Sequence, residues 1–133
     1  MTTFQVVSFD IGYRNFAFCV TEFDSDKVEQ LSQPSYRDRS LLLQQQPSRQ
    51  DRLDRIFLSG KTILFRNEDL AGQKNPSMEA VYRRLYEYLD EYQEYWVCAD
   101  YLLIEQQMQN RFRQNIKALK VAENTAAYFA LKY

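Results

Sequence analysis

The sequence predicts a single α/β domain whose mixed sheet begins with an antiparallel meander and continues through a helix, a strand and a second helix. Three observations predict this class. Runs rich in β-branched and aromatic residues mark strands near residues 4–10, 16–23 and 61–65. Apolar residues recur at helical spacing before and after the short apolar run 101–105. This element order is typical of an α/β sheet, and 133 residues are the size of one domain.

The first two strands are expected to form a hairpin through residues 11–15, because Gly12 is a turn signal. Residues from about 30 to 60 differ from the rest, since they are polar and contain a glutamine run at 44–46 and two prolines. We expect a long, mobile insertion there, with a short amphipathic helix over 49–58. The insertion is too small and too polar to be a separate domain, so residues 1–133 are expected to form one partial domain.

The second half of the chain is expected to hold two helices around one strand. Ser77 suits an N-cap, and the helix after it should run to about Tyr95. The strand at 101–105 is apolar at every position before its final acid, which indicates a strand covered on both faces. A last helix spans about 114–132, and its inward-facing stripe is expected to hold Ile116, Leu119, Ala126 and Phe129.

Composition excludes several classes of site. There is no histidine and no CxxC pair, which removes Ser-His and Cys-His nucleophiles and argues against zinc. Cys19 and Cys98 lie in apolar runs and are expected to be reduced core residues. No signal peptide or membrane span is evident, so we expect an intracellular protein, in the cytoplasm or nucleus, without a membrane partner. With a net charge of −1, a nucleic-acid partner would need a local basic patch.

Two acids stand where strands end, with Asp10 closing the first strand and Glu105 the fourth. A buried unpaired carboxylate is costly, and two neighbouring carboxylates repel unless a divalent cation lies between them. If the strands are adjacent, both acids emerge at one edge, where oxygen ligands favour Mg²⁺ or Mn²⁺ and phosphoryl chemistry. A structural alternative stays open, in which Asp10 caps a turn and Glu105 is a solvated charge.

Basic residues follow Glu105, with no acidic residue before position 123. These basic residues are Arg111, Arg113, Lys117 and Lys120. On a helix, Arg113, Lys117, Lys120 and Asn124 share one stripe, which would hold a phosphate backbone beside the acids. A solvated helix face explains the same residues equally well.

The two acidic motifs resemble those of a known family. They read Ser8-Phe9-Asp10-Ile11-Gly12 with Arg14, Asn15 and Ala17, and Ile104-Glu105-Gln106-Gln107. Over about residues 4–23 and 60–133, the chain resembles the RuvC-like Holliday junction resolvases, above all those of poxviruses and other large DNA viruses. The resemblance implies a ribonuclease H-like sheet. It also implies Mg²⁺-dependent endonuclease cleavage of branched DNA by a homodimer, in viral DNA recombination, replication or repair.

By this resemblance, Asp10 and Glu105 are expected to be catalytic metal ligands, and Arg14, Asn15 and Gln107 are candidates for contacts near the scissile strand. The family carries further acids, commonly a closely spaced pair, on a later helix, whereas the last acid here is Glu123. We therefore expect a C-terminally truncated domain that by itself cleaves weakly or not at all.

Two other functions fit parts of the sequence. One is a noncatalytic or degenerate DNA-binding half-domain. The other is a nucleotide-binding module of the actin and sugar-kinase type, in which Asp-x-Gly on the first hairpin contacts phosphate. The second phosphate loop of such modules is missing here, and the chain contains only three glycines.

Overall fold

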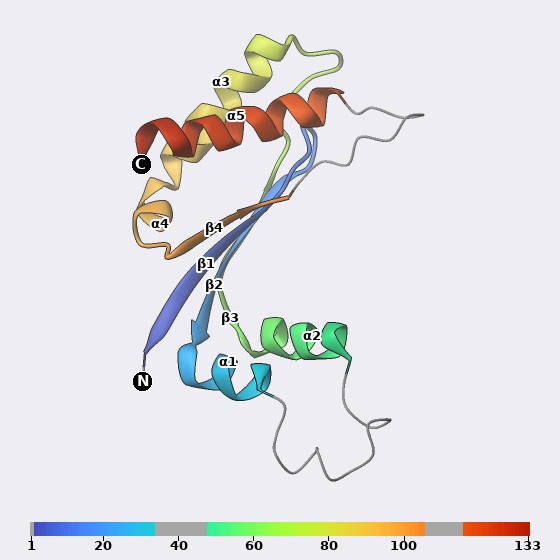
Figure 1. The fold of residues 1–133 in the computed structure, drawn as a ribbon. Helices are drawn as coiled ribbons and strands as arrows, with labels where there is room; N and C mark the ends of the chain where they lie inside the picture. Colours follow the sequence, from blue (N-terminus) through green and yellow to red (C-terminus); the bar gives the residue numbers. More distant parts are fainter. Residues whose placement is uncertain (1, 34–47, 106–115) are drawn as a thin grey trace.

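The chain forms a four-stranded sheet with helices packed against it (Figure 1). A computed structural model describes residues 2–33, 48–105 and 116–133. Its elements are, in chain order, β1 (Thr3–Asp10), β2 (Phe16–Asp24), α1 (Ser25–Ser32), α2 (Arg49–Ser59), β3 (Lys61–Glu68), α3 (Met78–Glu91), α4 (Gln93–Val97), β4 (Tyr101–Ile104) and α5 (Ile116–Lys132). The predicted α/β class is confirmed, and so is each predicted strand.

The strand order is β3-β2-β1-β4, which places β1 and β4 side by side. β1 and β2 pair antiparallel, as do β2 and β3, so the first three strands form the expected meander. β4 pairs with β1 in parallel, with Phe9 opposite Ile104. The adjacency of the first and fourth strands, on which the predicted acidic site depends, is therefore confirmed.

Alternation along the strands sends one set of side chains toward α3, α4 and α5, which cover one face of the sheet (Figure 1). On β1 this set includes Val7 and Phe9, and on β2 it includes Phe16 and Phe18; all four are buried. The aromatic rings of Phe9, Phe18, Trp96 and Phe129 pack against one another, with centroid separations of 4.9–6.0 Å. Each ring of this size buries a large apolar area.

The opposite face of the sheet is covered at one end by α1 and α2, near the N-terminus (Figure 1). Phe57 of α2 contacts the ring of Phe23, with centroids 6.4 Å apart. A Cβ at Gly60 would lie 2.5 Å from Thr21 Cγ2 and 2.7 Å from the Phe23 ring, so glycine lets the chain enter β3 close to the sheet. The expected helix over 49–58 is confirmed as α2, whereas α1 was not anticipated. Of the mobile insertion predicted over about residues 30–60, positions 34–47 lie outside the described residues.

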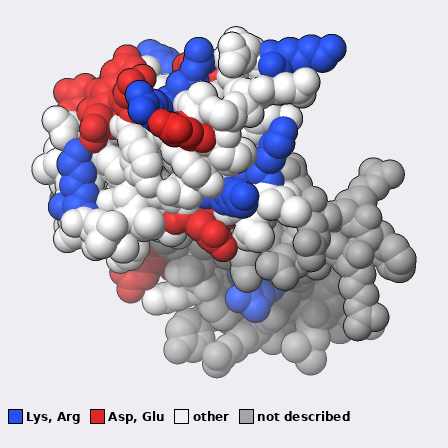
Figure 2. All heavy atoms as spheres, turned by 90° about the horizontal axis from the view of Figure 1, so that it is seen from above, with Lys and Arg blue, Asp and Glu red and all other residues white. Residues whose placement is uncertain are grey.

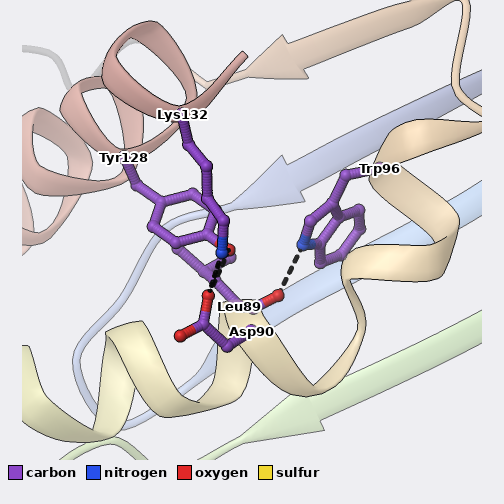
Figure 3. A network of polar contacts seen from close by, with 5 residues as sticks. All are labelled: Leu89, Asp90, Trp96, Tyr128 and Lys132. Carbon is purple, nitrogen blue, oxygen red and sulfur yellow. Dashed lines mark hydrogen bonds and ion pairs between the residues drawn. The ribbon is translucent and has the colours of Figure 1, made fainter.

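The long helix that was expected to reach Tyr95 is interrupted at Tyr92. Ser77 caps its start as predicted, accepting a hydrogen bond from the amide of Ala80. At the other end, the Trp96 indole donates to the carbonyl oxygen of Leu89 at 2.7 Å (Figure 3). Because the indole satisfies a carbonyl that the last turn leaves free, the chain can turn into α4 and bury Trp96.

A polar cluster joins the C-terminal ends of α3 and α5 (Figure 3). Asp90 accepts hydrogen bonds from the Tyr128 hydroxyl at 2.6 Å and from the Lys132 ammonium at 2.5 Å. These hydrogen bonds lower the pKa of the Asp90 carboxyl, while burial and the bond to Asp90 raise the pKa of Tyr128 to about 12. The cluster holds the end of α5 in place over the core.

Three expectations about burial are wrong. β4 is not covered on both faces, since Tyr101 is 60% and Leu103 47% exposed and β4 is the last strand of the described sheet. The inward stripe of α5 consists of Ala118, Val121, Thr125, Tyr128 and Phe129, so predicted Phe129 is confirmed and Leu119 is half-buried, but predicted Ile116 and Ala126 are exposed. Cys98 is exposed and Cys19 half-buried, both as free thiols.

None of the described helices is long and apolar enough to span a bilayer.

We expect Leu85→Ala to lower the free energy of unfolding by about 2–5 kcal/mol, because Leu85 is completely buried and truncation leaves a cavity. The matched control is Leu131→Ala, at a helical position that is 88% exposed, where a change within about 0.5 kcal/mol is expected. Urea unfolding followed by circular dichroism measures both. Equal losses in the two variants would contradict the described core.

We expect the Asp90 cluster to stabilise the fold above about pH 4 and to lose that effect in acid. The folded-state pKa of Asp90 lies below its ordinary value of 3.8, so the unfolded chain binds the proton more readily. The stability difference between the native chain and Asp90→Asn should therefore be present at pH 7 and shrink as the pH falls below about 4. Unfolding curves at several pH values test this, with Glu123→Gln as the control; a pH-independent difference would contradict it.

Candidate functional site

A hollow of about 430 Å³ opens on the sheet face opposite the α3–α5 layer. Its lining comes from β1, β2, β3, the turn after β1 and the residue that follows β4. The lining residues are Ser8, Phe9, Asp10, Asn15, Ala17, Phe18, Cys19, Phe65, Asn67 and Glu105. Two carboxylates, two amides and a hydroxyl therefore share one concave surface.

Strand register explains why these residues meet. Asp10 pairs with Ala17 and Ser8 with Cys19 across the hairpin, and Ala17 and Cys19 pair in turn with Asn67 and Phe65. Paired positions point to the same side of a sheet, and alternate positions along a strand share that side. The side chains next to these along β1 and β2, such as Phe9 and Phe18, point to the helix-covered side and are buried.

Asp10 and Glu105 are brought together as the sequence predicted. The register that places Phe9 opposite Ile104 continues one residue further, where the Glu105 amide donates to the Phe9 carbonyl at 3.2 Å. The two acids thus stand at the same end of adjacent parallel strands, and both line the hollow. This adjacency is one condition for a cation shared by the two carboxylates.

Burial is not the reason for a cation at Asp10 and Glu105. Both side chains are solvent-exposed, so the cost of burying a charge does not apply to them. Among the described residues, neither carboxylate accepts a hydrogen bond or forms an ion pair, so the alternative in which Asp10 caps a turn has no such contact to support it. Two free carboxylates on one concave surface still repel each other, and a divalent cation removes that repulsion.

The turn between β1 and β2 is tight because of Gly12. A Cβ at this position would lie 2.8 Å from the backbone oxygen of Asn15. Because this atom belongs to the backbone, it cannot move aside as the end of a flexible side chain can. The close approach brings Asn15 back to the hollow beside Asp10. Arg14, its neighbour in the turn, is exposed.

Asn67 is a site residue that the sequence reasoning missed. The third strand was expected to end at Phe65, whereas β3 continues to Glu68. The alternation Ile63, Phe65, Asn67 continues past the apolar run and could have placed Asn67 on the same face as Phe65.

The predicted basic stripe is described only in part. Gln107, Arg111 and Arg113 lie outside the described residues. Lys117 and Lys120 are exposed on α5, as predicted, but Asn124 accepts a hydrogen bond from the Tyr86 hydroxyl of α3 at 2.8 Å. Asn124 therefore joins two helices and is not a free member of the stripe.

The molecular face that carries α3 and α5 bears both signs of charge (Figure 2). Acidic side chains gather most densely at the upper left of that view, and basic side chains are scattered across it. With a net charge of −1 for the whole chain, a polyanion would be held by a local cluster of cations.

The donors of the hollow suit a hard divalent cation. Carboxylate oxygens of Asp10 and Glu105, with the amide oxygens of Asn15 and Asn67 nearby, are the ligand types that Mg²⁺ and Mn²⁺ prefer. Within the described ranges, no cluster of three acidic or sulfur-bearing side chains forms a complete metal-binding group. The site therefore offers two charged ligands and leaves the remaining coordination positions to amides, water or substrate.

Comparisons with known proteins place the chain near one viral protein. It is similar to "Uncharacterized protein 97L" of Invertebrate iridescent virus 3, with 29% identity over 139 residues. The match covers 97% of this chain and 66% of the relative, so the chain spans just under two thirds of that protein's length. No family profile matches the chain, and no solved structure matches its fold.

We expect Gly12→Ala to destabilise the protein by about 1–3 kcal/mol, because the added methyl collides with backbone and the turn must shift. The control is Ala17→Gly in the adjacent strand β2, which also changes one methyl group but removes it, so that no added atom collides with the backbone. Urea unfolding measures the loss, and amide chemical shifts locate the rearrangement. A Gly12→Ala variant with native stability and an unshifted Asn15 amide would contradict the tight turn.

Proposed function

We propose that this protein is a metal-dependent endonuclease that acts on branched DNA, of the Holliday junction resolvase type. The observation that carries the proposal is the meeting of Asp10 and Glu105 in one hollow, at the same end of two adjacent parallel strands. Clustered acids of this kind hold the divalent cations of phosphodiester hydrolysis. The class we propose is a hydrolase that binds DNA, works as a homodimer and uses Mg²⁺ or Mn²⁺.

The acids and amides of the hollow, and the basic residues proposed to bind DNA, have distinct parts in this proposal. Asp10 and Glu105 hold the cation, and a bound cation supplies neutralisation of charge at the scissile phosphate. Asn15 and Asn67 orient phosphate oxygens through their amide N–H groups. Arg14, Lys117 and Lys120 attract the DNA backbone, with the predicted Gln107, Arg111 and Arg113 as further contacts.

Two further observations support the proposal. An antiparallel meander with a parallel fourth strand beside the first is the sheet that a ribonuclease H-like fold requires of this part of the chain. The similarity to a protein of an iridescent virus agrees with a viral setting for the proposed activity, in recombination or replication of viral DNA inside the host cell.

The decisive variant is Asp10→Asn with Glu105→Gln, which keeps the size of both side chains and removes both charges. We expect it to weaken Mn²⁺ binding by more than about tenfold, since loss of outer contacts alone costs tenfold or more at metal sites. Isothermal titration calorimetry measures Mn²⁺ binding, and a labelled four-way junction measures cleavage. The matched control is Asp54→Asn with Glu123→Gln, at exposed positions outside the hollow.

Equal Mn²⁺ binding by the native protein and the Asp10/Glu105 variant would overturn the metal site. A second candidate function is a noncatalytic DNA-binding module, which is favoured by the lack of a third acid among the described residues of the hollow. That function predicts selective binding of the junction without cleavage in Mg²⁺ or Mn²⁺, and no dependence of DNA affinity on Asp10 and Glu105.

A further inference from the structure

The ring of Tyr13 lies beside two cations that come from different parts of the fold. Tyr13 belongs to the turn between β1 and β2, and its ring packs against the core. The Arg14 guanidinium carbon lies 5.3 Å from the ring centroid, and the Lys117 ammonium nitrogen of α5 lies 4.9 Å from it. Both distances fall within the range of cation–π attraction.

The two cations lack partners of opposite charge in the described structure. The described ion pairs join Glu79 to Arg83 and Asp90 to Lys132, and none includes Arg14 or Lys117. Two like charges gathered around one ring repel each other, and the aromatic ring offsets only part of that repulsion. An anion that contacts both cations would offset the rest.

The turn between β1 and β2 connects this cluster to the hollow. The tight turn at Gly12 returns Asn15 to the hollow, while Tyr13 and Arg14 lie between Gly12 and Asn15. Asp10 and Arg14 are therefore held by one short segment, residues 10–15, while Glu105 follows β4 and Lys117 belongs to α5. Four residues of chain span at most about 14 Å, so a DNA strand that meets Arg14 would also pass close to Asp10.

We propose that Tyr13 is a positioning residue that holds Arg14 and Lys117 together as a two-cation clamp for a backbone phosphate of the DNA strand that enters the hollow. This proposal rests on the proposed function and adds to it the place where the phosphate backbone is held. The guanidinium offers paired donors to phosphate oxygens and the ammonium offers a compact point charge. The ring keeps the two groups in reach of a single phosphate.

The test is a mutant cycle that combines Tyr13→Leu with Arg14→Ala/Lys117→Ala and measures the affinity of each variant for DNA. Tyr13→Leu removes the aromatic face, and Tyr13→Phe keeps it and removes only the hydroxyl. We expect Tyr13→Leu to weaken binding of a labelled four-way junction by about threefold to tenfold, and Tyr13→Phe to bind within twofold of the native protein. In an Arg14→Ala/Lys117→Ala background, Tyr13→Leu should cause no further loss. Thermal unfolding shows whether each variant keeps the native fold.

A second readout does not depend on DNA or on cleavage. The tyrosine ring should shift the NMR signals of the Lys117 ε-methylene and the Arg14 δ-methylene upfield, and inorganic pyrophosphate should perturb both groups together. Tyr13→Phe should retain these shifts and Tyr13→Leu should abolish them. Additive losses in the mutant cycle, or equal binding by Tyr13→Leu and Tyr13→Phe, would overturn the clamp.

The two proposals fail in different ways. If Asp10→Asn with Glu105→Gln leaves Mn²⁺ binding intact while the mutant cycle shows coupling, the clamp stands and the nuclease site falls. If the metal site and cleavage are found but Tyr13→Leu behaves like the native protein, the nuclease stands and the clamp falls.

Discussion

Parallel pairing of β4 with β1 is the constraint on which the rest of this structure depends. β1 is hydrogen-bonded on both edges, to β2 and to β4, so its alternating side chains define two surfaces at once. Val7 and Phe9 enter the core, and Ser8 and Asp10 point to the other side. A slip of one residue would exchange the two sets, placing a carboxylate in the core and a phenyl ring in water. Burial of the aromatic core therefore also sets the position of Asp10.

The two sides of the sheet meet different needs. The side under α3, α4 and α5 is packed with aromatic rings and supplies most of the apolar burial. The other side is covered by α1 and α2 at one end only, and its uncovered part holds the hollow together with exposed apolar residues of β3 and β4. A site for an extended, charged substrate needs such an open surface on a rigid support, and the packed side provides the rigidity.

Electrostatics in and around the hollow are arranged in two parts. Asp10 and Glu105 bring negative charge to the strand ends, and Arg14 and Lys117 gather positive charge around Tyr13 a few residues away. The proposed nuclease activity would need both, because acids that hold a cation also repel the phosphate backbone and nearby basic groups offset that repulsion. The tight turn at Gly12 links the two parts, so a shift in this turn would disturb both at once.

The sequence by itself determined the strands, the helix starting after Ser77 and the two acids, because these depend on local periodicity, capping and the residue types at strand ends. The tertiary structure decided what depends on neighbours: α3 ends early because Trp96 takes the Leu89 carbonyl, and Asn124 leaves the basic stripe to bond Tyr86. It also decided that β3 extends to bring Asn67 into the hollow, and that Lys117 meets Tyr13. The contacts of Asn124 and Lys117 join residues far apart in the chain, and no local pattern records which distant side chain will fill a given space.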